Sequence, residues 1–206
     1  MPDLLRVSGL RAGYGEAIVI DDVAFELGEG RSLALLGRNG TGKTTLLATL
    51  VGVTRYRAGS IELAGRALVP LRPDQRAGAG LGWVPQERNI FRSLTVLENL
   101  TAVARAGPWT PARAFAMFPR LLLLDEPLEG LAPLIVQELL KALTRIVRDE
   151  GLSAIIVEQN PARVLAMTDD AVILERGSVV HSSESARLAA DAATLDRYLA
   201  VGGRAH

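Results

Sequence analysis

The chain has 206 residues, 49% of them hydrophobic, which is enough for one large domain with a substantial core. Its 23 acidic and 23 basic residues cancel, which argues against a dedicated nucleic-acid-binding protein, because such proteins carry a basic excess. The absence of cysteine excludes a disulfide framework and a metal site built on thiolates.

The sequence shows no targeting or membrane-spanning segment. Its start, Met-Pro-Asp-Leu-Leu-Arg, lacks both the basic stretch and the long apolar stretch of a signal peptide. The longest apolar runs, such as Leu121–Leu124, are far too short to cross a bilayer. We therefore expect a cytoplasmic protein that does not insert into the membrane and reaches it only through partners.

Two strands are predicted before the first motif, near Leu4–Leu10 and Val23–Leu27, and Gly28–Gly30 looks like a hairpin-type turn into a third. Tyr14 lies between two glycines, so we expect its ring to be exposed on a loop. An exposed tyrosine there has two interpretations, an ordinary surface residue or a stacking platform for a purine ring.

The stretch that organises the chain is Gly-Arg-Asn-Gly-Thr-Gly-Lys-Thr-Thr at 37–45, which matches G-x-x-x-x-G-K-[ST]. An apolar run at Ser32–Leu36 predicts a buried strand directly before it, and Thr44–Val51 predicts a helix directly after it. Strand, glycine loop and helix in this order are what a phosphate-binding loop requires. The predicted nucleotide-binding residues of the loop are Gly37, Arg38, Asn39, Gly40, Thr41, Gly42, Lys43, Thr44 and Thr45.

The chemistry of this loop suits a nucleotide phosphate. Gly40 and Gly42 allow tight turns in which successive N–H groups point inward, and the start of the helix adds the positive end of its dipole. Lys43 can reach the β- and γ-phosphates, and the hydroxyl of Thr44 can ligate Mg²⁺. The chain contains only two lysines against 21 arginines, yet it places one of them here, where a compact point charge is useful.

A glutamine follows a strand in the middle of the chain. Gln86 comes just after the strand predicted at Gly80–Val84, where its amide could reach a metal ion or an attacking water, or could simply be solvated. Capping residues indicate two further helices downstream. The other elements predicted in this region are a strand at Ser60–Leu63 and helices at Pro73–Ala77, from Ser93 or Thr95 to Ala106, and at Thr110–Phe118.

An apolar strand that ends in two acids is predicted at Leu121–Asp125. A buried parallel strand delivers the residues at its C-terminal end to the ligand-binding edge of the sheet. Asp125 is placed there to hold Mg²⁺, directly or through water, and Glu126 to polarise an attacking water. An ordinary pair of acids at a strand end is the alternative, which the phosphate-binding loop in the same chain disfavours.

The last third of the chain alternates helices and strands. Gln159 follows a buried strand predicted at Ser153–Val157, and a polar residue there can contact the γ-phosphate region from the side. Alternating strands and helices around a phosphate-binding loop predict an α/β fold with a mostly parallel sheet flanked by helices. The other elements predicted are helices at Pro133–Glu150, Ala162–Met167, Ala186–Ala190 and Thr194–Val201, and a hairpin of Ala171–Leu174 with Ser178–Val180.

Taken together, these residues resemble the ATP-binding subunit of ABC transporters over nearly the whole chain. The resemblance implies a P-loop NTPase fold with an N-terminal antiparallel β subdomain, and ATP and Mg²⁺ as ligands. Tyr14 corresponds to the aromatic residue that stacks on adenine, and Gln86 to the glutamine that touches Mg²⁺ and the transmembrane partner. Asp125 corresponds to the metal-binding acid of the family, and Glu126 to its catalytic glutamate.

Finer phrases are similar to one subgroup, the ATP-binding subunits of importers of branched-chain amino acids and their urea and amide relatives. These phrases are Asp-Glu-Pro-Leu-Glu-Gly-Leu-Ala-Pro, Ile-Ile-Val-Glu-Gln-Asn and Phe-Arg-Ser-Leu-Thr-Val-Leu-Glu-Asn-Leu. In that subgroup a glutamine commonly replaces the family's switch histidine, and Gln159 stands at that place, which implies a catalytic role for it. The resemblance further implies transmembrane permease subunits and a second ATP-binding subunit as partners, at the inner face of the cell membrane.

One family feature is absent from the sequence. The signature motif L-S-G-G-x does not occur, because the chain contains no Ser-Gly-Gly. Only 39 positions separate Gln86 from Asp125 (125 − 86), the interval in which the family places its helical subdomain and that motif. We therefore expect one nucleotide-binding domain over 1–206 in which 87–120 is the remnant of the helical subdomain, through a deletion or an omitted segment near Pro119-Arg120-Leu121.

The missing motif has a mechanistic consequence. In the family each ATP lies between one subunit's phosphate-binding loop and the partner's signature loop, which supplies charge stabilisation to the transition state. If the deletion is real, we expect MgATP binding with little or no turnover. Two other functional classes stay open, a non-catalytic nucleotide-binding remnant and a soluble ATPase that acts on nucleic acid, although the latter should carry a coiled-coil insertion or a basic excess.

Overall fold

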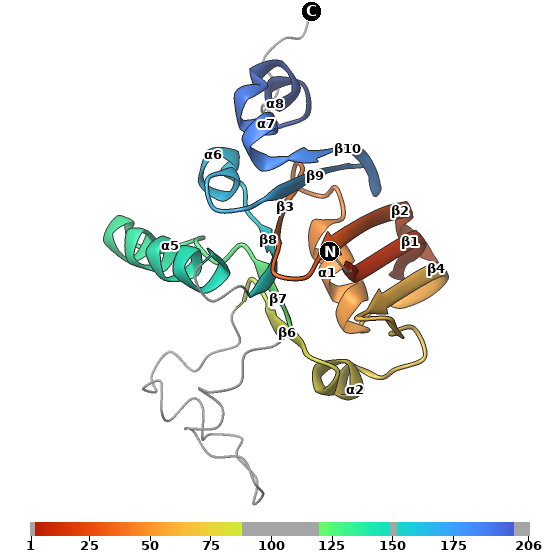
Figure 1. The fold of residues 1–206 in the computed structure, drawn as a ribbon. Coiled ribbons are helices and arrows are strands. Elements are labelled where there is room, and N and C mark those ends of the chain that lie inside the picture. Colours follow the sequence, from red (N-terminus) through yellow and green to blue (C-terminus); the bar gives the residue numbers. More distant parts are fainter. Residues whose placement is uncertain (1–2, 88–119, 149–151, 200–206) are drawn as a thin grey trace, which may run out of the picture.

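Two β-sheets that lie on either side of one helix, α1 (Lys43–Val51), form the frame of the protein (Figure 1). The computed structural model describes residues 3–87, 120–148 and 152–199. The first sheet is antiparallel, with the strand order β2-β1-β4-β5. Its strands are β1 (Asp3–Tyr14), β2 (Ala17–Gly28), β4 (Arg55–Leu63) and β5 (Arg66–Ala67).

The second sheet is mixed and contains the strand that leads into the phosphate-binding loop. Its order is β10-β9-β3-β8-β7-β6, in which all neighbours pair in parallel except β9 and β10. Because neighbouring parallel strands end at the same edge, the loops after β3, β6, β7 and β8 gather there. The strands are β3 (Ser32–Leu36), β6 (Leu81–Val84), β7 (Leu121–Asp125), β8 (Ser153–Val157), β9 (Asp170–Glu175) and β10 (Ser178–Glu184).

Two hydrophobic layers hold the mixed sheet between helices. On one face, leucines of α1 pack between the two sheets, and on the other face α5 and α6 cover the central strands (Figure 1). The strands β3 and β8 are buried along their whole length, which explains why their sequences are uninterrupted apolar runs. The remaining helices are α2 (Pro73–Gly78), α5 (Pro133–Arg148), α6 (Pro161–Leu165), α7 (Ser185–Ala190) and α8 (Ala192–Leu199).

This architecture is the predicted α/β fold, with an antiparallel β subdomain built largely from the N-terminal strands. Two local predictions are wrong. Gly28–Gly30 does not form a hairpin, because β2 and β3 belong to different sheets. Tyr14 is not on a loop but is the last residue of β1, paired with Ala17 across a tight turn. The helices predicted between Ser93 and Phe118 lie outside the described residues, as does the proposed subdomain remnant 87–120 except its two end residues.

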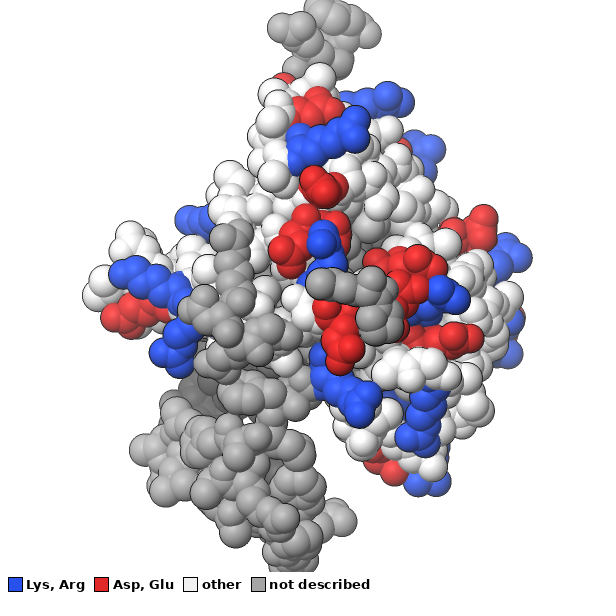
Figure 2. Space-filling view, viewed as in Figure 1, with Lys and Arg blue, Asp and Glu red and all other residues white. Residues whose placement is uncertain are grey.

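Acidic and basic side chains are interspersed over the described part of the surface shown in Figure 2. Several of them form exposed ion pairs within the antiparallel sheet, such as Arg6 with Glu26 and Arg11 with Asp21. The face in Figure 2 therefore carries no broad field of one sign on its described residues, in keeping with the balanced composition of the chain.

Candidate nucleotide-binding site

The loop between β3 and α1 has the conformation of an anion-binding turn. Gly37 and Gly42 have positive φ angles of 146° and 103°, which favour glycine. A Cβ atom on Gly37 would lie 2.5 Å from the carbonyl oxygen of Leu174 in β9, so the loop could not approach that strand with a larger residue. Gly42 caps α1 without a side-chain hydrogen bond, which leaves the first N–H groups of the helix available for an anion.

Lys43 is a buried cation at the start of α1, with 5% of its surface exposed. Its Nζ atom donates to the carbonyl oxygens of Gly37 at 2.8 Å and Arg38 at 3.0 Å. Burial lowers the pKa of Lys43, while the nearby carboxylates of Glu126 and Asp125 act in the opposite direction. An ammonium group has three N–H donors, so a further donor can serve a ligand in the loop.

Asp125, the last residue of β7, has a buried carboxylate. It is 1% exposed, and neither oxygen has a hydrogen bond of good geometry among the described residues. Burial raises the pKa of Asp125, whereas the neighbouring hydroxyl of Thr44 and the ammonium of Lys43 favour its charged form. An unpartnered buried carboxylate beside a hydroxyl suits Mg²⁺, which prefers oxygen ligands and few protein groups.

The described residues contain no cluster of three His, Cys, Asp or Glu side chains that could hold a metal by themselves. In a P-loop magnesium site a threonine hydroxyl, one acid and the phosphate oxygens share the ion. The predicted metal ligands Thr44, Asp125 and Gln86 come from α1, the end of β7 and the loop after β6 respectively. The residues present therefore fit the ion.

Glu126 is held in a strained backbone conformation. Its φ angle is +49°, in the left-handed region that is uncommon for residues other than glycine and concentrated at functional sites. Its N–H donates to the carbonyl of Val157 in β8 at 3.0 Å, which fixes the turn. Burial raises the pKa of Glu126, the amide of Gln159 lowers it, and Glu129 raises it further.

Three predicted catalytic residues meet at the carboxylate of Glu126. Gln159 Nε2 donates to Glu126 Oε2 at 2.8 Å, and Gln86 Nε2 approaches the same oxygen at 3.3 Å. The three residues follow β7, β8 and β6, neighbouring strands of the mixed sheet, which is why residues so far apart in the sequence come together.

Two acids of the site were missed by the sequence analysis. Glu129 accepts a hydrogen bond from Gln86 Nε2 at 2.6 Å, shorter than the contact of Gln86 with Glu126. Glu158 is buried, and its Oε1 accepts from the N–H of Leu128 at 3.0 Å, which ties the loop after Glu126 to the end of β8. No local sequence signal placed Glu129 near Gln86, because the two residues come together only through the pairing of β6 with β7.

A cavity of about 400 Å³ lies in front of the loop and contains most of the predicted site. Its lining is Val19, Asn39, Gly40, Gly42, Lys43, Thr44, Thr45, Gln86, Glu126, Glu129 and Gln159. Asp125 does not line it but lies against Thr44 and Lys43 in the protein interior. Thr41 does not line it either, and its Oγ1 instead donates to the carbonyl of Arg38 at 2.8 Å, which braces the loop.

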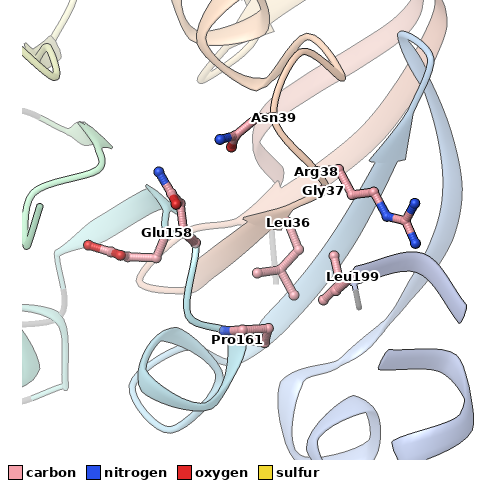
Figure 3. Close-up of a pocket in the computed structure, with 8 residues that line it drawn as sticks. Leu36, Gly37, Arg38, Asn39, Glu158, Pro161 and Leu199 are labelled. Atoms are coloured by element: carbon pink, nitrogen blue, oxygen red, sulfur yellow. The ribbon is translucent and has the colours of Figure 1, made fainter. Parts of the chain in front are cut away.

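Gly37 and Arg38 border a second cavity of about 360 Å³ on the other side of the loop (Figure 3). Leu36 from β3, Pro161 from α6 and Leu199 from α8 give it an apolar floor. Arg38 and Asn39 point in opposite directions from the loop, so only Asn39 reaches the cavity in front. Arg38 therefore does not line the 400 Å³ cavity, whereas Asn39 lines both cavities.

Tyr14 lies outside the lining of the 400 Å³ cavity. Its side chain is 51% exposed at the end of β1, as predicted for an accessible ring. Val19, which lines the cavity, lies on the paired strand β2 only two residues beyond Ala17, the partner of Tyr14. Stacking of a base on Tyr14 stays a prediction.

Comparison with known proteins identifies the family. Residues 20–114 match the family described as ABC transporter. The chain is 30% identical to the lipopolysaccharide export system ATP-binding protein LptB of Acidithiobacillus ferridurans, an alignment that covers 97% of this chain and 98% of that protein. It is 33% identical to the high-affinity branched-chain amino acid transport ATP-binding protein BraG of Pseudomonas aeruginosa, over 90% of this chain and 95% of that one. The chain belongs to the ABC transporter ATP-binding proteins.

Solved structures agree on the fold. The structure of cbiO1 from Clostridium perfringens, part of the ABC transporter complex cbiONQ, superposes with a TM-score of 0.77 at 20% identity. The match covers 96% of this chain and 94% of that one. The match with the ATP-binding cassette MJ0796 bound to ADP and Pi covers 88% of this chain and 98% of that one, with a TM-score of 0.73 at 16% identity. These likenesses establish the P-loop ABC ATPase fold.

The alignment with the Acidithiobacillus relative runs over 236 positions, whereas this chain has 206 residues. Some residues of that relative therefore have no counterpart in this chain.

Among the helices that the structure describes, none is both long and apolar enough to cross a membrane.

Proposed function

We propose that this ABC transporter ATP-binding protein binds MgATP through the loop Gly37–Thr45 and couples its binding to a transmembrane permease. The observation that carries the proposal is the buried carboxylate of Asp125 beside Thr44 and Lys43, which has no hydrogen bond of good geometry from the described residues. Leaving such a carboxylate without a partner costs free energy, so its retention at the edge of an anion-binding loop is best explained by a cation that arrives with the phosphates.

Each predicted residue then has a defined role. Lys43 holds the β- and γ-phosphates, while Thr44, Asp125 and Gln86 hold Mg²⁺, which neutralises phosphate charge when bound. Glu126 accepts a proton from, or polarises, the attacking water, because its carboxylate faces the same cavity as Lys43. Gln159 keeps that carboxylate in place through its 2.8 Å hydrogen bond.

Turnover is expected to be slow. The sequence carries no L-S-G-G-x motif, so a second subunit cannot complete the γ-phosphate site with the usual backbone donors. We place the missing residues between Gln86 and Asp125, where only 39 positions remain, and the 236-position alignment supports a missing stretch in this chain. The alternative, a non-catalytic nucleotide-binding remnant, differs only in having no turnover at all.

The test is a pair of measurements on the purified chain. MgATP binding by calorimetry should be retained, and phosphate release should be slow but slightly above the level of a Glu126→Gln variant; release equal to that level supports the non-catalytic remnant instead. Release well above the Glu126→Gln level contradicts slow turnover, and absence of MgATP binding refutes the proposed function. The matched control is Glu138→Gln, an acid in α5 away from the cavity.

For the transported solute we propose a branched-chain or other hydrophobic amino acid, with the chain attached to permease subunits on the inner face of the cell membrane, paired with a second ATP-binding subunit. BraG, at 33% identity, and the glutamine at position 159 support this choice. The LptB relatives, at 30% to 31% identity, support export of a lipopolysaccharide as the second candidate.

Copurification distinguishes the two candidates. The tagged chain is co-expressed with permease subunits of each class from the same genome, and the complex that survives membrane extraction is identified. Capture of the amino-acid permease supports the first candidate, and capture of the lipopolysaccharide permease overturns it in favour of the second.

A further inference from the structure

The tight turn after Tyr14 is held by two arginines from a neighbouring strand. Gly15 and Glu16 connect β1 to β2. Arg55 Nη1 donates to Glu16 Oε1 at 2.6 Å and to the carbonyl of Gly15 at 3.3 Å. Arg57 Nη2 donates to Glu16 Oε2 at 3.2 Å and to the same carbonyl. Both carboxylate oxygens of one turn residue and the carbonyl of the other are thus bound from β4.

Fold stability does not account for this arrangement. The Glu16 side chain is 84% exposed, that of Arg55 55% and that of Arg57 26%, and ion pairs to so exposed a carboxylate contribute little to stability. The other exposed pairs of the sheet join strand residues, as Arg6 does with Asp3 and Glu26. The contacts of Arg55 and Arg57 instead converge on the turn.

The turn is built to be tight. Gly13 lies opposite Ile18, and a Cβ atom on Gly13 would lie 2.0 Å from the carbonyl oxygen of Ala17. The register between β1 and β2 shifts at this point, so that Val19 has no partner of its own in β1. Such an irregularity redirects side chains, and Val19 lines the 400 Å³ cavity in front of the phosphate-binding loop.

The backbone of Tyr14 is therefore tied to β2, the strand that brings Val19 to the cavity. Its partner Ala17 precedes Val19 by two residues, which is about 7 Å along a strand. Exposed apolar surface is present on both strands of the hairpin, since Tyr14 is 51% and Ile18 49% exposed. An aromatic ring stacks well on a base only when its position is defined, because a mobile ring must be ordered on binding.

We propose that Arg55 and Arg57, acting through Glu16, are positioning residues that hold Tyr14 ready to stack on the base of the bound nucleotide. This inference rests on the proposed function, because it concerns the base site of the same nucleotide. The arginines act on the turn and not on the phosphates, so the removal of their hydrogen bonds affects binding only of ligands that carry a base.

The experiment compares MgATP with magnesium tripolyphosphate, which has the phosphates but no base. Replacing both arginines (Arg55→Gln with Arg57→Gln) should weaken MgATP binding about 5-fold, a fraction of the affinity that a stacked base supplies, and should leave tripolyphosphate binding unchanged. In a Tyr14→Ala background the same two substitutions should have no further effect. Arg6→Gln, which removes an equally exposed pair from the same sheet, is the matched control and should bind both ligands like the parent chain.

The outcomes separate the two proposals. Unchanged MgATP binding, equal weakening of tripolyphosphate binding, or an undiminished effect in the Tyr14→Ala background each overturns the positioning role. Failure of the parent chain to bind either ligand refutes the proposed function itself. Thermal denaturation checks that each variant is folded, and a loss of MgATP binding in the Arg6→Gln control equal to that of the double variant also overturns the proposal.

Discussion

The two ends of α1 each carry a buried cation, and the two cations differ in how their hydrogen bonds are used. Lys43 at the N-terminal end and Arg76 at the C-terminal end are both only 5% exposed. Arg76 comes from α2, and its Nη1 donates to the carbonyls of Thr49 and Leu50 at 2.8 and 2.7 Å. Its Nε donates to the carbonyl of Leu71 at 3.0 Å. Burial lowers the pKa of both side chains.

The difference is in what surrounds each charge. Carboxylates lie near Lys43, and a cavity of about 400 Å³ opens beside it. Arg76 is enclosed by backbone, to the point that a Cβ atom on Gly52 would lie 2.9 Å from its Cζ. A guanidinium with several fixed donors is suited to satisfy the last carbonyls of a helix, whereas a compact ammonium is suited to a ligand. Arg76 therefore serves the fold, whereas Lys43 is the cation that we propose binds the phosphates.

The largest expected effect is the loss of Arg76. Arg76→Met should lower the free energy of unfolding by about 3 kcal/mol, because four backbone carbonyls lose a donor. Denaturant unfolding measures this, and Arg66→Met, an exposed arginine of β5, is the control and should change stability little. If Arg76→Met lowers the free energy of unfolding no more than the control does, water replaces the guanidinium at these carbonyls. Arg76 would then have no special structural role, and the proposed difference from Lys43 would be wrong.

Lys43→Met is the reciprocal substitution. It should weaken MgATP binding by about 100-fold, because charge-assisted hydrogen bonds to phosphate are lost. The unliganded protein should be no less stable than the parent near neutral pH, since burial lowers the pKa of Lys43 and so penalises its charged form.

The pH dependence gives Lys43→Met a second readout. With a folded-state pKa below the usual value of 10.5, the folded chain binds fewer protons than the unfolded chain between the two values. Stability of the parent should therefore rise with pH across that window, relative to Lys43→Met. Calorimetry and denaturation as a function of pH check both effects, and a parent chain that loses stability relative to the variant in that window would contradict the assignment.

The sequence predicted the ligand end of α1 far better than the other end. The glycine loop is a local motif, so the bounds of β3 and the position of α1 agree with the prediction to within one residue. The position of Asp125 at the end of a strand was predictable because the residue ends an apolar run. Arg76 was not, because within Pro-Asp-Gln-Arg it has the pattern of a surface residue in a short helix, and its partners Thr49 and Leu50 lie more than 25 positions away.

The contact of Gln86 with Glu129 escaped prediction for the same reason, since it depends on β6 pairing with β7 across residues that the sequence alone does not align. Tyr14 shows the converse case. Its exposure was predicted from flanking glycines, but its place at the end of a strand depends on the length of β1, which the sequence pattern underestimated.

A substitution at Gly177 tests whether its contacts support the phosphate-binding loop at the N-terminal end of α1. This residue, with φ +83°, donates its N–H to the carbonyl of Thr41 at 3.0 Å and accepts from the N–H of Asp21 at 2.9 Å. A Cβ atom there would lie 2.1 Å from the carbonyl oxygen of Val19. Gly177→Ala should destabilise the protein by about 2 kcal/mol and weaken MgATP binding, because the phosphate-binding loop must move.

Gly65 provides the control for that substitution. Its φ angle is +75°, but a Cβ atom would have nothing within 4 Å. Gly65→Ala should therefore cost about 1 kcal/mol through backbone strain alone, with MgATP binding unchanged. Equal losses of stability for the two variants, measured by denaturant unfolding, would mean that the contact with Val19 is not responsible.

The smallest effect expected concerns the one buried acid beside Lys43 that has no hydrogen-bond partner among the described residues. Burial raises the pKa of Asp125, so its charged form is disfavoured in the folded chain without Mg²⁺. Asp125→Asn should then stabilise the unliganded protein by about 1 kcal/mol near pH 7.5. The gain should shrink as the pH falls through the raised pKa towards 3.8, because the parent carboxyl becomes neutral there in both states.

Asp169→Asn is the control. Asp169 Oδ2 accepts from the N–H and the hydroxyl of Ser32 at 2.9 and 2.8 Å, so this variant should lose stability instead. With added Mg²⁺ and ATP the parent should become more stable than Asp125→Asn, because only the parent carboxylate can hold the ion. If MgATP stabilises Asp125→Asn as much as it stabilises the parent, Asp125 is not part of the site.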